Sequence, residues 1–327
     1  DPRERFDALA LAQSIESKAG GVEGLPAKFF VAIDGGGSMP LDGIGADLHL
    51  VAMGKDELAA IAFAFATPDG LSWVGATSIA RASEASFSII AGFAAMRRTG
   101  RTEARRLRDL DVELAQELVR QAALKPVTTL FKQPSALQAG LIDLGAEHAI
   151  LLALPFGRCS ADQLAQAAGW SERFGRGEIR LSFTRGILLP VLSGEDAALV
   201  LNEARRSGFI VSPDDPRLSL IACPGRPACG GALTSAPDDA LRIAGAAEGL
   251  LAQGVTLHVS GCPKGCAHPG KADLTLMGRD DGSYDAVLGG STRDAAFLHL
   301  SVDEIMTRLL PVKTLSDLHR AFQETTR

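Results

Sequence analysis

Aromatic residues are scarce in this chain of 327 residues, which has one Tyr and two Trp. Aromatic side chains are the platforms on which the bases of single-stranded nucleic acids stack, so the sequence offers little for such a partner. The net charge is −6, from 33 basic and 39 acidic side chains, and it lacks the basic excess that attracts phosphate backbones. We therefore expect no nucleic-acid partner.

Long apolar runs are also absent. No run reaches the ~18 apolar residues that a membrane span needs, so we expect no membrane partner. The first residues, Asp-Pro-Arg-Glu-Arg, lack the pattern of a secretory signal peptide. Only five cysteines are present, and an odd, clustered set argues against a secreted disulfide framework. These absences together predict a cytoplasmic protein.

Four of the five cysteines form two pairs, Cys223-x5-Cys229 and Cys262-x3-Cys266, and Pro and Gly residues stand within each pair. Four thiolates on two tight loops suit a [4Fe–4S] cluster or a zinc ion. Structural zinc sites favour closer pairs, so the wide first spacing favours the cluster. Cysteines that bind no metal are the remaining alternative. The fifth, Cys159, is interpreted as a buried core residue.

Alternating strand and helix signals predict an α+β fold. We expect three domains, over residues 1–125, 126–210 and 211–327, with the Pro- and Gly-containing segment 126–146 at the first boundary. Within the second domain, strands are predicted over 148–154, 178–183 and 187–192. Ser160 and Ser193 are predicted to cap the helices between and after them. This β-α-β-β-α order is typical of a ferredoxin-like half-domain.

In the third domain, predicted strands over 218–222 and 255–259 each lead directly into one cysteine pair. A helix capped by Ser235 lies between them. Its predicted buried stripe consists of Leu241, Ala244, Ala247 and Leu251. A capping box at residues 301–304 is expected to open the last helix.

At this point the sequence resembles a known family. The cysteine spacing resembles that of the siroheme nitrite and sulfite reductase superfamily. Three segments resemble, more narrowly, the precorrin-3B synthases of aerobic cobalamin biosynthesis. These are Ser-Gly-Cys-Pro-Lys-Gly-Cys-Ala-His-Pro at 260–269, Leu-Pro-Ala-Lys-Phe at 25–29 before Asp-Gly-Gly-Gly at 34–37, and the motifs at 177–181 and 184–190. The resemblance implies nitrite/sulfite reductase-like α/β domains at 1–125 and 211–327, the latter binding the cluster, on either side of the half-domain.

Three departures from the reductases fit the synthases better. The reductases carry a second anion-binding lysine where this chain has Phe30, Asn where it has Lys264, and Arg where it has His268. Family members also begin with a further ferredoxin-like half, about one hundred residues long by usual domain sizes. We expect that half to be absent from this sequence.

The resemblance implies a monooxygenase that converts precorrin-3A to precorrin-3B with O2 and two electrons. Cys266 matches the cysteine that bridges cluster and siroheme in the reductases. A mononuclear non-heme iron is implied as well, and its ligands are not assigned, although His258 and His268 lie nearest to the cluster in sequence. The glycine-rich segments do not complete a nucleotide motif, so a separate reductase is expected to supply the electrons. The catalytic residues stay unknown.

Precorrin-3A carries many carboxylates, which require inward-facing cations. Six basic residues at strand ends or on the cysteine loops are candidates: Lys28, Arg158, Arg180, Arg185, Arg226 and Lys264.

Two other functions stay open, a siroheme-dependent nitrite or sulfite reductase and a non-catalytic cluster-binding fragment. A stretch of six arginines within residues 97–108 also has two interpretations, a solvated face and a docking patch for an acidic partner.

Overall fold

The structure, a computed structural model, describes residues 1–54, 60–67, 70–127 and 137–323. The chain divides into two compact units, Asp1–Ala136 and Leu137–Arg327. The predicted boundary segment 126–146 lies partly outside the described residues. Among the described residues, no helix has the length and apolar character needed to cross a membrane.

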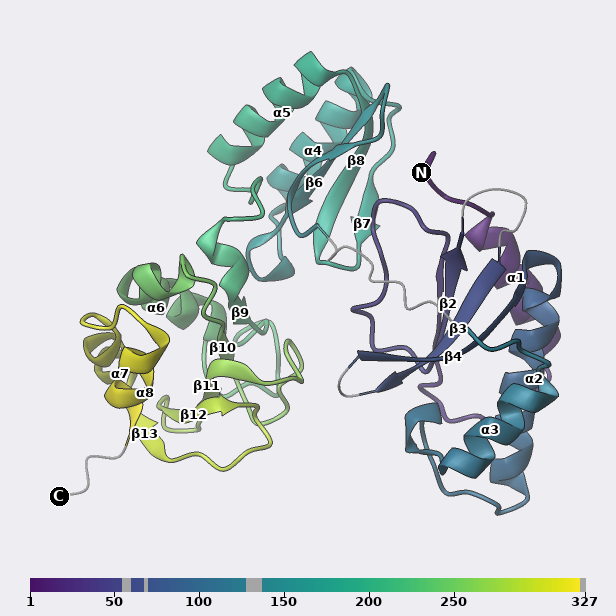
Figure 1. Cartoon of the computed structure of the whole chain (residues 1–327). Helices are drawn as coiled ribbons and strands as arrows, with labels where there is room; N and C mark the ends of the chain where they lie inside the picture. The colour runs from purple at the N-terminus through teal and green to yellow at the C-terminus, as the bar shows by residue number, and fades with distance from the viewer. Residues whose placement is uncertain (55–59, 68–69, 128–136, 324–327) are drawn as a thin grey trace. The chain divides into compact units, whose positions relative to one another are not determined.

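The first unit is a four-stranded sheet with its helices packed on one face (Figure 1). The strand order is β1-β2-β3-β4, with β1 and β2 parallel and the other pairs antiparallel. Leu50 and Phe63 of the central strands and Phe93 of α2 are fully buried in its core. In chain order the elements are α1 (Ala8–Ala19), β1 (Val31–Asp34), β2 (Leu48–Met53), β3 (Ala60–Thr67), β4 (Gly70–Ser78), α2 (Ile79–Arg98), η1 (Leu107–Asp109) and α3 (Val112–Gln121).

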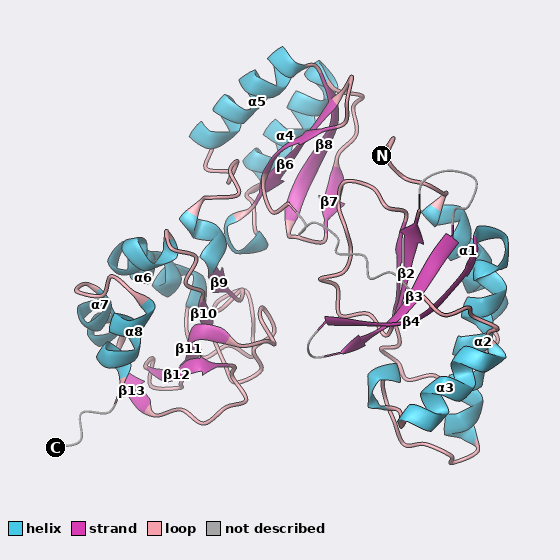
Figure 2. Ribbon diagram, viewed as in Figure 1, coloured by secondary structure: helices cyan, strands magenta, loops and turns pink. Residues whose placement is uncertain are grey.

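The second unit begins with a four-stranded antiparallel sheet of order β5-β6-β8-β7, on which α4 and α5 lie (Figure 2). Ser160 caps α4 in a capping box with Gln163, and Ser193 caps α5, as predicted. The elements are β5 (Gly140–Asp143), β6 (His148–Ala153), η2 (Pro155–Gly157), α4 (Ala161–Phe174), β7 (Arg180–Ser182), β8 (Gly186–Leu192) and α5 (Gly194–Arg206).

The rest of the second unit is a five-stranded sheet of order β13-β12-β11-β10-β9, in which β9, β10 and β11 are parallel and the last two strands antiparallel. Its core joins Leu257 and Leu274 to Ile243 of α6 and Ile305 of α7. The elements are η3 (Pro216–Ser219), β9 (Leu220–Ala222), α6 (Ala236–Leu251), β10 (Leu257–Ser260), β11 (Ala272–Gly278), β12 (Tyr284–Gly290), β13 (Leu298–Leu300), α7 (Val302–Leu309) and α8 (Leu315–Phe322).

Three expectations were wrong, the first of them only in part. The buried stripe of α6 includes Ala247 and Leu251 as predicted, but it also passes through Ile243 and Leu250, and Leu241 is 61% exposed. The capping box at Ser301 opens α7, but α7 is followed by α8. Cys159 is exposed, because it lies in the surface turn just before the cap of α4.

Candidate functional site

Both cysteine pairs begin at the same edge of the five-stranded sheet. β9 ends at Ala222, directly before Cys223, and β10 ends at Ser260, two residues before Cys262. The strands are parallel neighbours, and the Cys223 amide donates to the Val259 carbonyl at 3.2 Å. Because the carboxyl ends of parallel strands meet at one sheet edge, Cys223 and Cys262 follow neighbouring strand ends although they lie far apart in the sequence.

Hydrogen bonds join the first cysteine loop, which holds Cys223 and Cys229, to the second, which holds Cys262 and Cys266. The Leu233 amide, at the end of the first loop, donates to the Gly261 carbonyl of the second at 2.6 Å. The Gly261 amide donates in turn to the Cys223 sulfur at 3.1 Å. A Cβ on Gly261 would lie 3.1 Å from Ala232 and 3.4 Å from that sulfur, so glycine permits this close approach. The two loops therefore form one structure.

Positive φ angles turn each loop. Gly225 and Gly265 both have φ of 60°, the left-handed region that favours glycine. A Cβ on Gly225 would lie 2.6 Å from the Ala236 amide, and one on Gly265 would lie 2.3 Å from the Thr292 hydroxyl. Both glycines thus allow the loops to pack against the following elements, which fixes where the cysteines stand.

The four cysteines differ in exposure. Cys223 and Cys262 are buried, Cys229 is half-buried and Cys266 is exposed. An amide that donates to a thiolate stabilises its charge and lowers its basicity, as expected around an iron–sulfur cluster. Among the residues that the structure describes, no three His, Cys, Asp or Glu side chains converge on the position of a single metal ion.

Three predicted cations touch backbone carbonyls of the cysteine loops. Arg226 donates from Nε to Ala232 at 2.7 Å, Arg158 reaches Pro224 at 3.5 Å, and Arg185 donates to Ala267. A fourth, Lys264, has its ammonium 4.0 Å from where a Cβ on Gly231 would stand. No ion pair involves any of the four in the described ranges. Four cations without carboxylate partners thus surround the loops.

Arg185 has an unusual backbone conformation. Its φ of 64° lies in the left-handed region, as does that of Phe156 at 56°. Such angles are uncommon for residues other than glycine and persist where surrounding packing imposes them. The stem of Arg185 packs on Gly157, whose added Cβ would lie 3.1 Å from it. The β7–β8 turn and η2 therefore together direct Arg185 to the second cysteine loop.

The two other predicted cations are placed differently. Arg180 of β7 is exposed and pairs with Glu178 at 2.9 Å, so its charge has a carboxylate partner. Lys28 is exposed and lies in the first unit. Their roles in substrate binding stay predictions.

His258 lies in β10, the strand that leads to Cys262. It is fully buried, and neither ring nitrogen has a hydrogen-bond partner. Its ring meets that of His268 edge to face, with centroids 5.6 Å apart. Burial, with the nearby His268 and Arg185, lowers the pKa of His258 to about 4. The imidazole is therefore neutral at pH 7.

A buried hydrogen-bond network behind the first loop was not predicted. The Tyr284 hydroxyl donates to Asp239 at 2.7 Å and lies 2.7 Å from the Thr234 hydroxyl. Thr234 also accepts the Arg226 amide through its carbonyl at 2.9 Å. Burial raises the pKa of Tyr284, so this hydroxyl stays protonated. Nothing in the sequence links these residues, which come from a loop, a helix and a strand.

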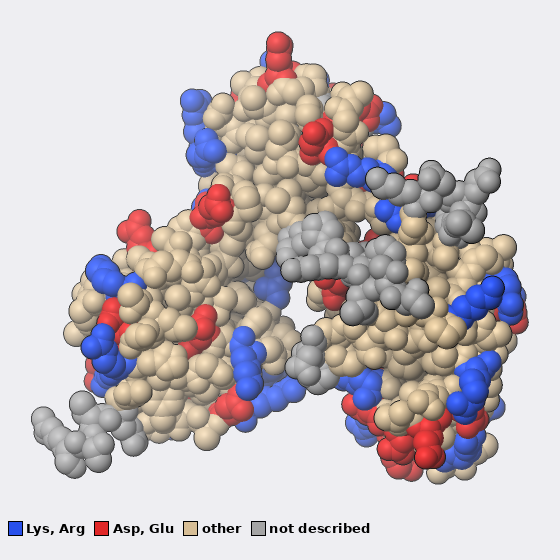
Figure 3. Space-filling view, in the orientation of Figure 1, with Lys and Arg blue, Asp and Glu red and all other residues tan. Residues whose placement is uncertain are grey.

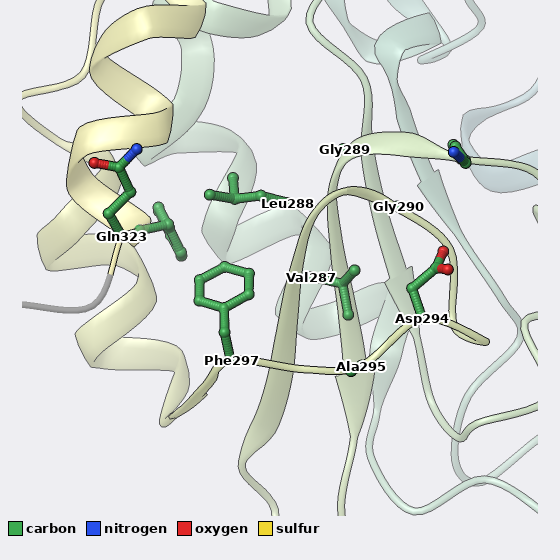
Figure 4. Close-up of a pocket in the computed structure, with 10 residues that line it drawn as sticks. Val287, Leu288, Gly289, Gly290, Asp294, Ala295, Phe297 and Gln323 are labelled. Carbon is green, nitrogen blue, oxygen red and sulfur yellow. The ribbon is translucent and has the colours of Figure 1, made fainter.

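A pocket of about 400 Å³ is lined by the end of β12, the segment that follows it and the end of α8 (Figure 4). Phe297 and Leu288 line it with apolar side chains, and Lys271 and Asp294 line it with charged ones. None of the six predicted substrate-binding cations lines it. The pocket therefore does not extend the cation site.

Comparisons with known proteins show what this chain is similar to. Residues 144–207 match the family model of the nitrite/sulfite reductase ferredoxin-like half domain. A precorrin-3B synthase of Sinorhizobium sp. is 30% identical over 275 residues, 82% of this chain and 57% of that protein. The chloroplastic ferredoxin–nitrite reductase of Oryza sativa subsp. japonica is 30% identical over 129 residues, 39% of this chain and 22% of that protein. The solved structure of the Mycobacterium tuberculosis NirA protein matches with a TM-score of 0.68 over 94% of this chain and 65% of that one, at 19% identity.

These findings define the class of protein. The chain has the α+β fold of the NirA protein, contains the ferredoxin-like half domain, and is related to the nitrite and sulfite reductases. Its similarity to a precorrin-3B synthase extends over most of its length, which confirms the predicted resemblance. The chain aligns with little more than half of that relative and with about a fifth of the rice reductase, so the activity of the whole protein is a matter for proposal.

Proposed function

We propose that this chain performs the precorrin-3B synthase reaction, the oxygen-dependent conversion of precorrin-3A to precorrin-3B. The observation that carries the proposal is the set of four cations without carboxylate partners around the joined cysteine loops. Such a set suits a tetrapyrrole with several acetate and propionate groups, because each carboxylate needs a charge-assisted partner. The similarity to a precorrin-3B synthase over 82% of the chain supports it.

The cofactor proposed for this site is a [4Fe–4S] cluster held by Cys223, Cys229, Cys262 and Cys266. When bound, it would supply the two electrons of the reaction one at a time, from a separate reductase. The Gly261 amide would stabilise the Cys223 thiolate. A further mononuclear iron belongs to the same proposal, without assigned ligands.

The protein's own side chains would bind and orient the substrate. The Arg185 guanidinium is held by packing on Gly157 and by its bond to Ala267, so little side-chain entropy is lost when it pairs with a carboxylate. Cys266 is the exposed member of the four cysteines, so the ring would approach from its side. Neutral His258 brings no further positive charge to that region.

The first experiment is an absorption spectrum of the anaerobically reconstituted protein. A broad visible shoulder without sharp bands is expected for a bare cluster, whereas sharp tetrapyrrole bands in the purified protein support the siroheme reductase alternative. The second is incubation with precorrin-3A, O2 and a chemical reductant. A product heavier by one oxygen atom is expected, and an unchanged substrate would contradict the proposal.

A further inference from the structure

The arginine-rich stretch at 97–108 is largely used inside the first unit. Arg97 donates to the carbonyls of Gly24 and Ala104, and Arg101 makes a bidentate pair with Glu117 at 2.8 and 3.0 Å. On the face of this unit that Figure 3 shows, basic side chains alternate with acidic ones. The docking-patch interpretation of this stretch therefore has little support. Arg106 has a different set of partners.

Arg106 joins a buried carboxylate to the segment that contains Lys28. Its Nη1 lies 2.7 Å from Asp47 Oδ2, and the same nitrogen donates to the Lys28 carbonyl. The side chain of Asp47 is 1% exposed and that of Arg106 is 27% exposed. Charges buried in this way are held in place by their partners, because either one alone would remain desolvated and unpaired.

Asp47 binds the backbone of the same segment two residues further on, at Phe30. Its carboxylate accepts the Phe30 amide at 3.1 Å, and its own amide donates to the Phe30 carbonyl at 2.8 Å. Asp47 directly precedes β2, and Arg106 directly precedes η1, so two regular elements anchor the pair. The segment Leu25–Phe30 is thereby fixed at residues 28 and 30.

We infer that Asp47 and Arg106 are positioning residues that hold Lys28 for an anionic ligand. Lys28 has an exposed side chain on a backbone fixed at its carbonyl, and no carboxylate within the described residues pairs with it. A fixed backbone leaves only the side chain to be ordered when an anion binds. The inference rests on the proposed function, because a carboxylate-bearing tetrapyrrole is the ligand that it names.

The first test measures the tether without any ligand. Trypsin cleaves after Lys28, at the carbonyl that Arg106 binds, so the rate at which the Lys28–Phe29 bond is cut reports opening of this segment. Loss of a charge-assisted bond in Arg106→Ala or Asp47→Asn is expected to raise this rate about tenfold, as followed by mass spectrometry. Arg106→Lys keeps the charge but not the planar guanidinium group, and its cleavage rate is expected to lie between those of wild type and Arg106→Ala.

Arg101→Ala is the matched control, because it removes an arginine ion pair of the same unit that does not touch Leu25–Phe30. It should leave cleavage at Lys28 at the wild-type rate. Circular dichroism identifies any variant that has lost its fold, and the two milder variants, Asp47→Asn and Arg106→Lys, then decide the outcome. An unchanged cleavage rate in folded variants would overturn the tether.

The second test is a double-mutant cycle with uroporphyrin, a stable tetrapyrrole that carries acetate and propionate groups. Arg106→Ala is expected to weaken binding about fivefold in the wild-type background and less than about twofold in the Lys28→Ala background, because it acts through Lys28. Equal losses in both backgrounds would overturn the inference, as would unchanged binding in Lys28→Ala. A wild-type protein that does not bind uroporphyrin contradicts the proposed function instead, and the cleavage rate then decides the positioning on its own.

Discussion

The buried His258 of β10 makes the stability of this protein depend on pH. His258 is fully buried with both ring nitrogens unpartnered, and its pKa is lowered from 6.5 to about 4. The unfolded chain therefore binds a proton at this residue between pH 6.5 and 4, while the folded protein does not. The contribution of His258 to the free energy of unfolding is fully present above pH 6.5 and is lost as the pH falls through this window.

The size of the effect follows from the shift. One pKa unit corresponds to about 1.4 kcal/mol, so His258 should destabilise the protein by about 2 kcal/mol when the pH falls from 7.5 to 5.0. His258→Leu has no titrating group, so its free energy of unfolding should fall by about 2 kcal/mol less over the same interval. The difference between the two proteins removes the contribution of every other titrating group.

Urea denaturation followed by circular dichroism measures these free energies at a series of pH values. His319→Leu is the matched control, because it removes an exposed histidine of α8. If wild type and His258→Leu lose the same free energy between pH 7.5 and 5.0, His258 is not a neutral buried group and the reasoning is refuted. A loss that is larger in His258→Leu would have the wrong sign and refute it equally.

Two further predictions concern the cysteine loops and their cations. After anaerobic reconstitution, Cys262→Ser should lose most of its iron and sulfide while Cys159→Ser, at an exposed site, keeps both; the opposite result would contradict the cluster assignment. Arg185→Asn, which tolerates the left-handed φ, should weaken uroporphyrin binding by about 1–3 kcal/mol at low salt and leave the cluster spectrum unchanged. Arg176→Ala, an exposed arginine of the same half-domain paired with Glu147, should bind as wild type does, and equal losses in the two variants would indicate non-specific charge.

The sequence predicted the strands that lead to the site because local signals and burial agree there. β6, β8 and β10 are short apolar runs flanked by turn or cap residues, and their positions are close to those expected. β13 has only three residues, and β5 only four, so neither gives a periodic pattern. The stripe of α6 was misplaced because the helix is apolar on several sides, so that Ile243 rather than Leu241 faces the core.

The site itself was only partly predictable. The four cysteines are visible as a spacing, whereas the Gly261 amide that reaches the Cys223 sulfur depends on the register of two strands. Tyr284, Thr234 and Asp239 meet only because strand, loop and helix converge. Side-chain hydrogen bonds between residues 45 and 50 positions apart leave no local pattern to recognise.

The partners of an arginine separate a structural role from a ligand-binding one more clearly than its position in sequence does. Arg101 and Arg106 each pair with a carboxylate, so their charges are already neutralised and can attract little else. Arg158, Arg185 and Arg226 instead touch carbonyl oxygens of the cysteine loops, which hold the guanidinium groups but leave the positive charge unbalanced. The carbonyl tether of Arg185 lies at Ala267, directly after the exposed Cys266, and the proposed ligand with several carboxylates would balance the charge of these arginines.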